Sequence, residues 1–248
     1  ILISNDDGYT ANGIKTLASF LSDFAEVLVC APDGPRSGYS CAFSANTPLH
    51  LEHQNNIPNC EVWSCSGTPV DCIKLALNRL VERKPDLVIS GINHGDNSSV
   101  NTHYSGTMGI AREGCLKYIP SIAFSSCDYN PDANLEPLRH YVVKIVKQVL
   151  NEGLPKGVCL NVNFPARNNF KGIKVRRMGY GSWLKETLRC EHPRGFDYYW
   201  MLGKYRNDEP SATDTDQWAL KEGYVTITPT RIDITDYDML DKMKAWEE

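Results

Sequence analysis

The stretch ILISNDDGYT (residues 1–10) sets two adjacent acids, Asp6 and Asp7, on a glycine turn directly after a short apolar run. Residues 1–3 predict a buried strand, and residues 5–8 are a strong breaker that ends it. The acids are therefore expected at the carboxyl end of a strand, the edge of an open α/β sheet where ligands bind. Two like charges held side by side repel each other unless a cation or a proton lies between them. The stretch thus predicts a metal site.

Strand-like apolar runs alternate with amphipathic helical patterns over residues 1–165. This strict alternation predicts βαβ units, a mostly parallel sheet with helices on both faces, and therefore the α/β class. Residues 48–66 form a short polar-interrupted stretch to which neither pattern assigns an element. The expected strands are 1–3, 26–32, 86–90, 120–126 and 157–165, and the expected helices are 12–23, 69–84, 105–118 and 135–150.

The last third of the sequence has a different character. Residues 173–210 are rich in aromatic and charged residues, in strand-length pieces separated by Gly and Pro, which predicts a protruding hairpin or arm. Residues 222–234 predict a returning strand. We expect a core over residues 1–171, and an arm with a returning strand and helix over residues 172–248 that completes the same domain. Exposed aromatics on an arm predict self-association; the alternative is an arm folded back on its own core.

Composition narrows the class of protein. With 248 residues, 42% hydrophobic and 23% charged, the chain is typical of a soluble globular protein. A net charge of −4 argues against a broad surface for nucleic acid or anionic membrane but allows small anionic substrates. No stretch approaches a membrane span, and nothing at the start resembles a signal peptide. Nine cysteines without CxxC predict free thiols and a cytoplasmic location, and six histidines lack zinc-site spacing.

Three further polar clusters are expected at the same sheet edge as the opening acids: residues 33–40, 91–97 and 103–109. Asp6 and Asp7 can supply anionic oxygens, and Ser37 and Asn93 can supply neutral ones. An all-oxygen set suits Mg²⁺ or Mn²⁺ rather than zinc. Four protein ligands do not fill the coordination sphere of such an ion. The remaining positions can be taken by water and by a substrate phosphate, as is usual for magnesium.

The start of a predicted helix supplies a second half to this site. Ser105, Gly106 and Thr107 can present hydroxyls and backbone N–H groups to a phosphate at the positive end of the helix, and Gly106 permits close approach. An ordinary N-cap would give the same pattern, and each of the other clusters alone is more often a plain turn. Their joint placement at one edge favours a site.

Absent motifs narrow the chemistry further. The sequence has no GxxxxGK[ST], no GxGxxG after a strand and no GxSxG, which argues against a P-loop, a dinucleotide-binding fold and a serine hydrolase elbow. An oxygen-ligated divalent metal beside a phosphate cradle predicts metal-assisted hydrolysis of a phosphate ester.

These residues resemble the SurE survival proteins, a family of metal-dependent nucleotidases. The resemblance rests on ordered motifs spread over the whole chain: NDDG (5–8), APDGPRSGYS (31–40), SGTPVDC (66–72), SGINHGDN (90–97), HYSGTMGIAREG (103–114) and DTDQWALKEGYVTITP (214–229). It implies a Rossmann-like three-layer αβα core whose C-terminal arm is exchanged between subunits in homodimers or homotetramers. A local departure is Met108, where many relatives have Val.

The resemblance also implies an activity and a set of site residues. The family hydrolyses nucleoside 5'-monophosphates, often 3'-monophosphates and sometimes short polyphosphate, with one divalent ion per subunit. The implied metal ligands are Asp6, Asp7, Ser37 and Asn93. The implied phosphate contacts are Asn97, Ser105, Gly106 and Thr107.

The mechanism stays open at this point. Asp6 and Asp7 could both act through the metal, or one of them could take a proton from the attacking water. An aspartyl-phosphate route is a rival, although its acids normally alternate rather than stand side by side. A non-catalytic nucleotide-sensing module is the non-enzymatic rival. Base preference, 5' against 3' preference, polyphosphate activity, the choice of metal, and dimer against tetramer are also open.

Overall fold

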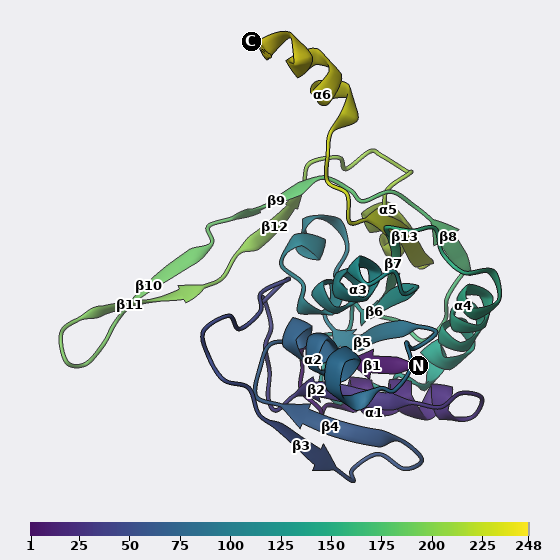
Figure 1. The fold of residues 1–248 in the computed structure, drawn as a ribbon. Coiled ribbons are helices and arrows are strands. Elements are labelled where there is room, and N and C mark those ends of the chain that lie inside the picture. Colours follow the sequence, from purple (N-terminus) through teal and green to yellow (C-terminus); the bar gives the residue numbers. More distant parts are fainter. Residues whose placement is uncertain (248) are drawn as a thin grey trace.

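The computed structural model describes residues 1–247 and contains a mixed nine-stranded sheet at its centre (Figure 1). The strand order is β3-β4-β2-β1-β5-β6-β7-β13-β8, and only the β3–β4 and β7–β13 pairs are antiparallel. The strands of this sheet are β1 (Leu2–Ser4), β2 (Leu28–Pro32), β3 (Leu51–Gln54), β4 (Glu61–Cys65), β5 (Val88–His94), β6 (Ser121–Ser126), β7 (Val158–Phe164), β8 (Ile173–Val175) and β13 (Val225–Arg231). The expected mostly parallel α/β sheet is confirmed.

Helices cover both faces of the sheet because successive strand residues point to opposite sides. Ile3 packs in the apolar cluster that includes α1 (Asn12–Ser22) and α4 (Arg139–Glu152), whereas Leu2 packs in the cluster of the other face. That second face is covered by α2 (Pro69–Leu75) and α3 (Gly106–Leu116). Short helical turns complete the core: η1 (Ala76–Leu80), η2 (Ser99–His103) and η3 (Glu136–Leu138).

One local expectation was wrong, and one stretch without an expected element contains two strands. The helix expected over 69–84 ends at Leu80, since α2 passes into the π-helical turn η1 and the chain then becomes extended at Val81. The stretch 48–66 contains β3 and β4, which lie at one edge of the sheet. β3 has no buried residue, so an edge strand of this kind lacks the apolar alternation that predicts a strand.

The C-terminal third divides its residues between the main sheet and the surface. β8 and β13 join the main sheet, so residues 172–248 contribute to the core as well as to an arm. The arm is a long hairpin that projects from the body (Figure 1), built from β9 (Gly181–Leu184), β10 (Thr187–Glu191), β11 (Asp197–Met201) and β12 (Lys204–Asn207). The helix α5 (Asp216–Glu222) packs on β13.

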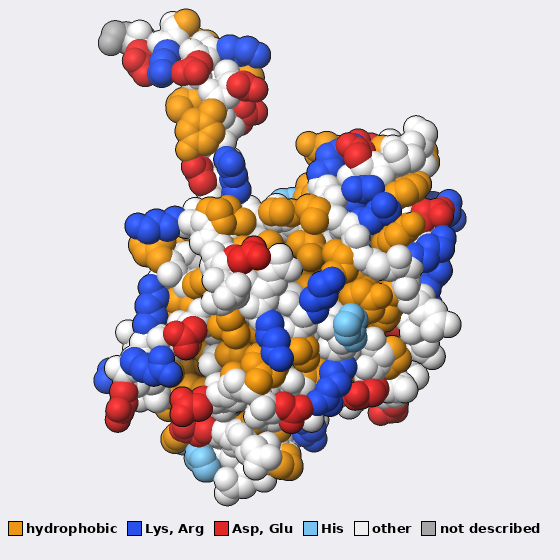
Figure 2. Space-filling view, turned by 90° about the vertical axis from the view of Figure 1, so that its right-hand side faces the viewer, with side chains coloured by type: hydrophobic (Ala, Val, Ile, Leu, Met, Phe, Trp, Pro, Cys, Tyr) orange, Lys and Arg blue, Asp and Glu red, His pale blue; other side chains and the backbone are white. Residues whose placement is uncertain are grey.

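The chain ends in a segment that stands away from the body. α6 (Tyr237–Met243) and the turn η4 (Lys244–Trp246) carry no buried residue, and Figure 2 shows this segment apart from the rest of the surface. All nine cysteines have free thiols. Across residues 1–247 the structure has no helix with both the length and the apolar composition needed to cross a bilayer.

Candidate active site

The candidate site begins in the turn that follows β1. Asn5 closes this turn, because its side chain donates to the Gly8 carbonyl at 3.0 Å and accepts from the Gly8 N–H at 3.2 Å. Gly8 has a φ of +102°, a left-handed conformation that a side chain would strain. Asp6 and Asp7 are therefore held between two fixed residues at the carboxyl edge of the sheet.

Asp6 is buried against the start of α3. Its side chain is 4% exposed, and its Oδ1 accepts a 2.7 Å hydrogen bond from Thr107 Oγ1. A Cβ atom on Gly106 would lie 2.8 Å from Asp6 Cβ, so glycine is required for this approach. Burial raises the pKa of Asp6 to about 6, with the Asp7 charge acting in the same direction and the Thr107 hydrogen bond opposing it.

Asp7 carries a buried oxygen that lacks a donor. Its Oδ2 has no hydrogen-bond partner among residues 1–247. Burial raises the pKa of Asp7, while the charge and backbone of His94 lower it. An unpaired buried carboxylate oxygen is destabilising, and a cation beside it would remove that penalty. This oxygen is the clearest sign in the structure that Asp7 is suited to hold a metal.

The other two predicted ligands lie at the same sheet edge as this turn, Ser37 in the loop after β2 and Asn93 near the end of β5. The Arg36 N–H donates to the Asp6 carbonyl at 2.7 Å, so the next residue, Ser37, lies beside the acids with its side chain exposed. Asn93 is the penultimate residue of β5, next to His94. Its amide nitrogen donates to the Gly95 carbonyl at 2.7 Å, which leaves the amide oxygen to bind a ligand.

The donor chemistry of these four residues fits a hard divalent cation. Carboxylate, hydroxyl and amide oxygens are the ligands that Mg²⁺ and Mn²⁺ prefer. Within residues 1–247, no group of three or more His, Cys, Asp or Glu side chains is arranged to hold a metal. A cation at this turn would therefore need the neutral oxygens of Ser37 and Asn93 in addition to the two acids.

The start of α3 faces Asp6 and has the geometry of an anion site. Ser105 is the N-cap, and its Oγ accepts the Met108 N–H at 3.0 Å. The first intrahelical bond runs from the Gly109 N–H to the Ser105 carbonyl at 3.0 Å, so the N–H groups of Gly106 and Thr107 have no partner within the helix. These two N–H groups can bind a phosphoryl oxygen. The Thr107 hydroxyl is already bonded to Asp6.

Asn97 lies in a buried network of amides that sequence reasoning missed. Its N–H donates to Asn163 Oδ1 at 2.8 Å, its Nδ2 donates to Ser125 Oγ at 2.7 Å, and its carbonyl accepts from Asn161 Nδ2 at 2.8 Å. Asn163 Nδ2 also donates to Asn161 Oδ1 at 2.9 Å. One sequence feature could have predicted this network: two asparagines alternate with apolar residues in NVNF (161–164), within an otherwise apolar strand. His94 was likewise overlooked, although it directly follows Asn93.

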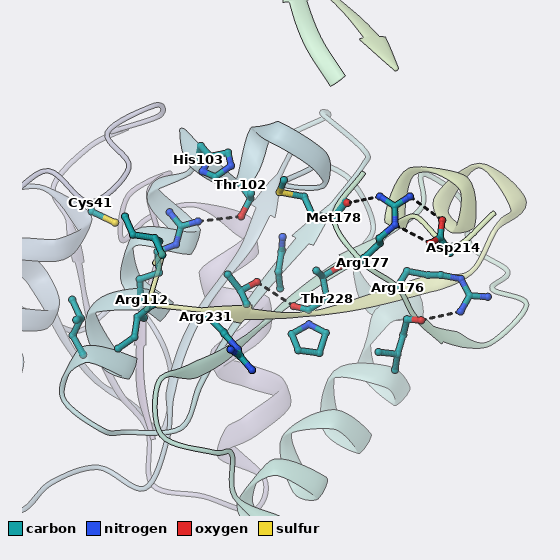
Figure 3. Close-up of a pocket in the computed structure, with 17 residues that line it drawn as sticks. Cys41, Thr102, His103, Arg112, Arg176, Arg177, Met178, Asp214, Thr228 and Arg231 are labelled. Atoms are coloured by element: carbon teal, nitrogen blue, oxygen red, sulfur yellow. Dashed lines mark hydrogen bonds and ion pairs between the residues drawn. The ribbon is translucent and has the colours of Figure 1, made fainter. Parts of the chain in front are cut away.

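A cavity of about 920 Å³ lies elsewhere, beside β13 (Figure 3). Its lining includes Arg112, Arg176, Arg231 and Asn161, together with Thr102 and none of the predicted site residues. We place the site at the strand ends instead, because the buried acids and the open helix start lie there and offer both metal and phosphate ligands.

Comparison with known proteins shows the family of this chain. The family model described as "Survival protein SurE" matches residues 1–185. The chain belongs to the SurE family. A SurE protein from Aquifex aeolicus, known from its crystal structure, superimposes with a TM-score of 0.84 at 37% identity, over 100% of this chain and 99% of that one.

Curated SurE relatives match over nearly the whole chain. A protein of Phocaeicola vulgatus named 5'-nucleotidase SurE is 50% identical, covering 99% of this chain and 96% of its own. A protein of Bacteroides fragilis with the same name is 49% identical, covering 100% of this chain and 97% of its own. The SurE model ends at residue 185, inside the projecting hairpin, whereas these full-length matches include the C-terminal third.

Proposed function

We propose that this protein is a divalent-metal-dependent phosphomonoesterase that hydrolyses nucleoside 5'-monophosphates to nucleoside and phosphate. The observation that carries the proposal is the contact between Asp6 and the start of α3, where Thr107 bonds the acid and Gly106 lies against it. This contact sets candidate metal ligands directly beside candidate phosphate donors. The naming of close relatives as 5'-nucleotidases supports the substrate class.

In this proposal Asp6, Asp7, Ser37 and Asn93 hold one cation, Mg²⁺ or Mn²⁺. When bound, such an ion supplies charge neutralisation at the phosphoryl oxygens and a water of lowered pKa. The Thr107 hydroxyl fixes the orientation of the Asp6 carboxylate. The Asp7 carboxylate supplies the second negative charge that the cation would neutralise.

The phosphoryl group in this proposal binds at the start of α3. The N–H groups of Gly106 and Thr107, the Ser105 hydroxyl and Asn97 stabilise charge on its oxygens, helped by the positive end of the helix. Burial of Asp6 keeps bulk water away from one side of the reacting group. Asp7 is less buried and is the better placed of the two acids to take a proton from an attacking water.

Finer features belong to the same proposal. Hydrolysis of 3'-monophosphates and short polyphosphate would use the same cradle, since it binds the phosphoryl group rather than the base. The exposed apolar side chains of the hairpin, among them Tyr199, Trp200 and Met201, suit a homodimer or homotetramer interface. Nine free thiols suit a reducing cytoplasm.

The test is release of inorganic phosphate from a panel of 5'- and 3'-nucleoside monophosphates, with EDTA and then with Mg²⁺ or Mn²⁺ restored. We expect EDTA to abolish release and either metal to restore it. Release that is indifferent to EDTA, with a modified Asp6 or Asp7 trapped by a phosphate mimic, would favour the aspartyl-phosphate route. Folded protein that binds nucleotide without releasing phosphate under any metal would favour a sensing module.

A further inference from the structure

The two sides of the proposed phosphate cradle are joined by one short segment. Asn97 lies before this segment, and Ser105 ends it at the N-cap of α3. Between them the chain forms η2, with Tyr104 as the only residue between η2 and Ser105. The position of η2 therefore sets the spacing between the two sides of the cradle.

The start of this segment is held by an acid from the C-terminal third. Asp216 is 1% exposed, and its carboxylate accepts N–H groups from Ser99 at 2.8 Å, Gly179 at 2.9 Å and Gln217 at 2.8 Å. Asp216 and Ser99 are 117 residues apart in sequence. One buried carboxylate thus ties the start of η2 to the base of the hairpin and to α5.

Ser99 has the backbone conformation of a residue held by its surroundings. Its φ is +50°, in the left-handed region that is unfavourable for a residue with a side chain. Such strain persists where neighbouring contacts fix the residue, and it is found most often at functional sites. The Ser99 hydroxyl lies 2.7 Å from the Gly179 carbonyl and 2.6 Å from the Tyr205 hydroxyl, so the hairpin supplies these fixing contacts.

Two more contacts extend the attachment along η2. Trp183 Nε1 donates to Asn101 Oδ1 at 2.9 Å, from a strand at the hairpin base. On the opposite side, Arg112 of α3 donates to Thr102 Oγ1 at 3.4 Å (Figure 3). The segment is thereby held between the hairpin base and the helix that binds the phosphoryl group.

We propose that Asp216 and Tyr205 are positioning residues for the phosphate cradle. This inference rests on the proposed function of the cradle. Neither residue touches substrate; both hold Ser99, and through η2 they set the distance from Asn97 to the N–H groups of Gly106 and Thr107. The hairpin base is then part of the machinery for phosphate binding, in addition to any role of the hairpin in assembly.

The chemistry of Asp216 predicts a specific sensitivity. All three partners of the Asp216 carboxylate are backbone N–H groups, which need an acceptor. The amide side chain of an Asp216→Asn variant has one oxygen and one NH₂ group, so at least one of these N–H groups would face a donor. Asp216→Asn is therefore expected to displace Ser99 and loosen η2. A misplacement of about 1 Å at a catalytic group can lower a rate by about 100-fold, so the cradle should respond strongly.

The test compares three variants of the full chain at 25 °C: Asp216→Asn, Tyr205→Phe and the control Asp214→Asn. Asp214 is two residues from Asp216 but is exposed and bonded to Arg177 at 2.8 Å (Figure 3). For each variant we would measure KM and kcat with a nucleoside 5'-monophosphate, the inhibition constant of inorganic phosphate, Tm, and amide exchange of residues 97–107.

We expect KM and the phosphate inhibition constant to rise about tenfold or more in Asp216→Asn. Tyr205→Phe removes a single hydrogen bond, worth about fivefold in an equilibrium constant, and should raise both constants by about that factor. Amide exchange of residues 97–107 should become faster in both variants, and Asp214→Asn should match the wild type in every measurement. Tyr205→Phe keeps the test decisive if Asp216→Asn does not fold.

Wild-type phosphate affinity and exchange rates in both folded variants would overturn the inference, as would a lowered Tm with unchanged KM. Absence of metal-dependent phosphate release by the wild type would instead overturn the proposed function. In that case, binding of inorganic phosphate, measured as a rise in Tm, would still decide whether Asp216 and Tyr205 position the cradle.

Discussion

The Thr107 hydroxyl donates a 2.7 Å hydrogen bond to Asp6 Oδ1 across 101 residues of sequence. This bond joins the turn after the first strand to the first turn of α3. It orients a buried carboxylate whose other oxygen faces Gly106. The hydroxyl of Thr107 therefore serves Asp6 and is not free to bind another group.

Asp7→Asn should lower kcat/KM by about 100-fold or more, since even groups that only orient metal ligands contribute 10- to 100-fold in known metal sites. The fold should survive, because Asp7 Oδ2 makes no hydrogen bond within residues 1–247. Phosphate release and circular dichroism would check both points. The control is Asp86→Asn, an exposed acid away from the site whose ion pair with Arg83 is worth little. Near-normal turnover by folded Asp7→Asn would remove Asp7 from the site.

Gly106→Ala should reduce kcat/KM by at least about tenfold, because the new Cβ would lie 2.8 Å from Asp6 Cβ and push the acid away from its position. Gly34→Ala is the matched control, since its Cβ would meet only the Arg36 side chain at 3.8 Å. Steady-state kinetics for both variants, with Mg²⁺ titrated, would measure the effect. Equal activity in the two variants would show that the close contact between Gly106 and Asp6 has no catalytic consequence.

The pKa of Asp6 predicts a pH dependence of stability in EDTA. Its folded-state pKa of about 6 is above the ordinary value of 3.8, so the folded protein takes up a proton that the unfolded chain lacks as pH falls from about 7 to 4. Stability from this group should rise by up to about 3 kcal/mol over that range. Relative to Asp6→Asn, the wild type should therefore gain stability as the pH falls.

Urea unfolding of both proteins between pH 4 and 8 would measure this difference. At pH 8 the order of stability of the two proteins should depend on the metal. Asp6→Asn is expected to be more stable than the wild type in EDTA, and Mg²⁺ should stabilise only the wild type. A stability difference that is constant across the pH range would contradict the assigned environment of Asp6.

Asn163→Ala should destabilise the protein by about 3 kcal/mol, because it leaves the buried N–H of Asn97 and the Oδ1 of Asn161 unpaired. We also expect weaker binding of inorganic phosphate, since Asn97 loses the partner of its backbone N–H. Asn78→Ala is the control: its exposed side chain makes one bond to the Lys74 carbonyl, and the change should stay within about 0.5 kcal/mol. Equal stability of the two variants would show that the amide network is dispensable.

Several elements were predictable from local pattern. The helix expected over 12–23 is present as Asn12–Ser22, and the strand expected over 157–165 is present as Val158–Phe164. The edge strand Leu51–Gln54 was missed because it buries no side chain and so shows no apolar period. The helix expected within residues 172–248 had no predicted bounds, because Asp216–Glu222 is short and its polar first turn gives no amphipathic pattern.

The sequence by itself determined the alternation of strands and helices over most of residues 1–165, the placement of Asp6, Asp7 and Ser37 after strands, and that of Asn93 near the end of one. These follow from local periodicity and from the rule that parallel strands share one carboxyl edge. Only the tertiary structure decided how deeply Asp6 is buried, which oxygen of Asp7 lacks a donor, and that Asp216 holds Ser99. Burial and hydrogen bonding between distant residues depend on how elements pack in space, and no local pattern records that packing.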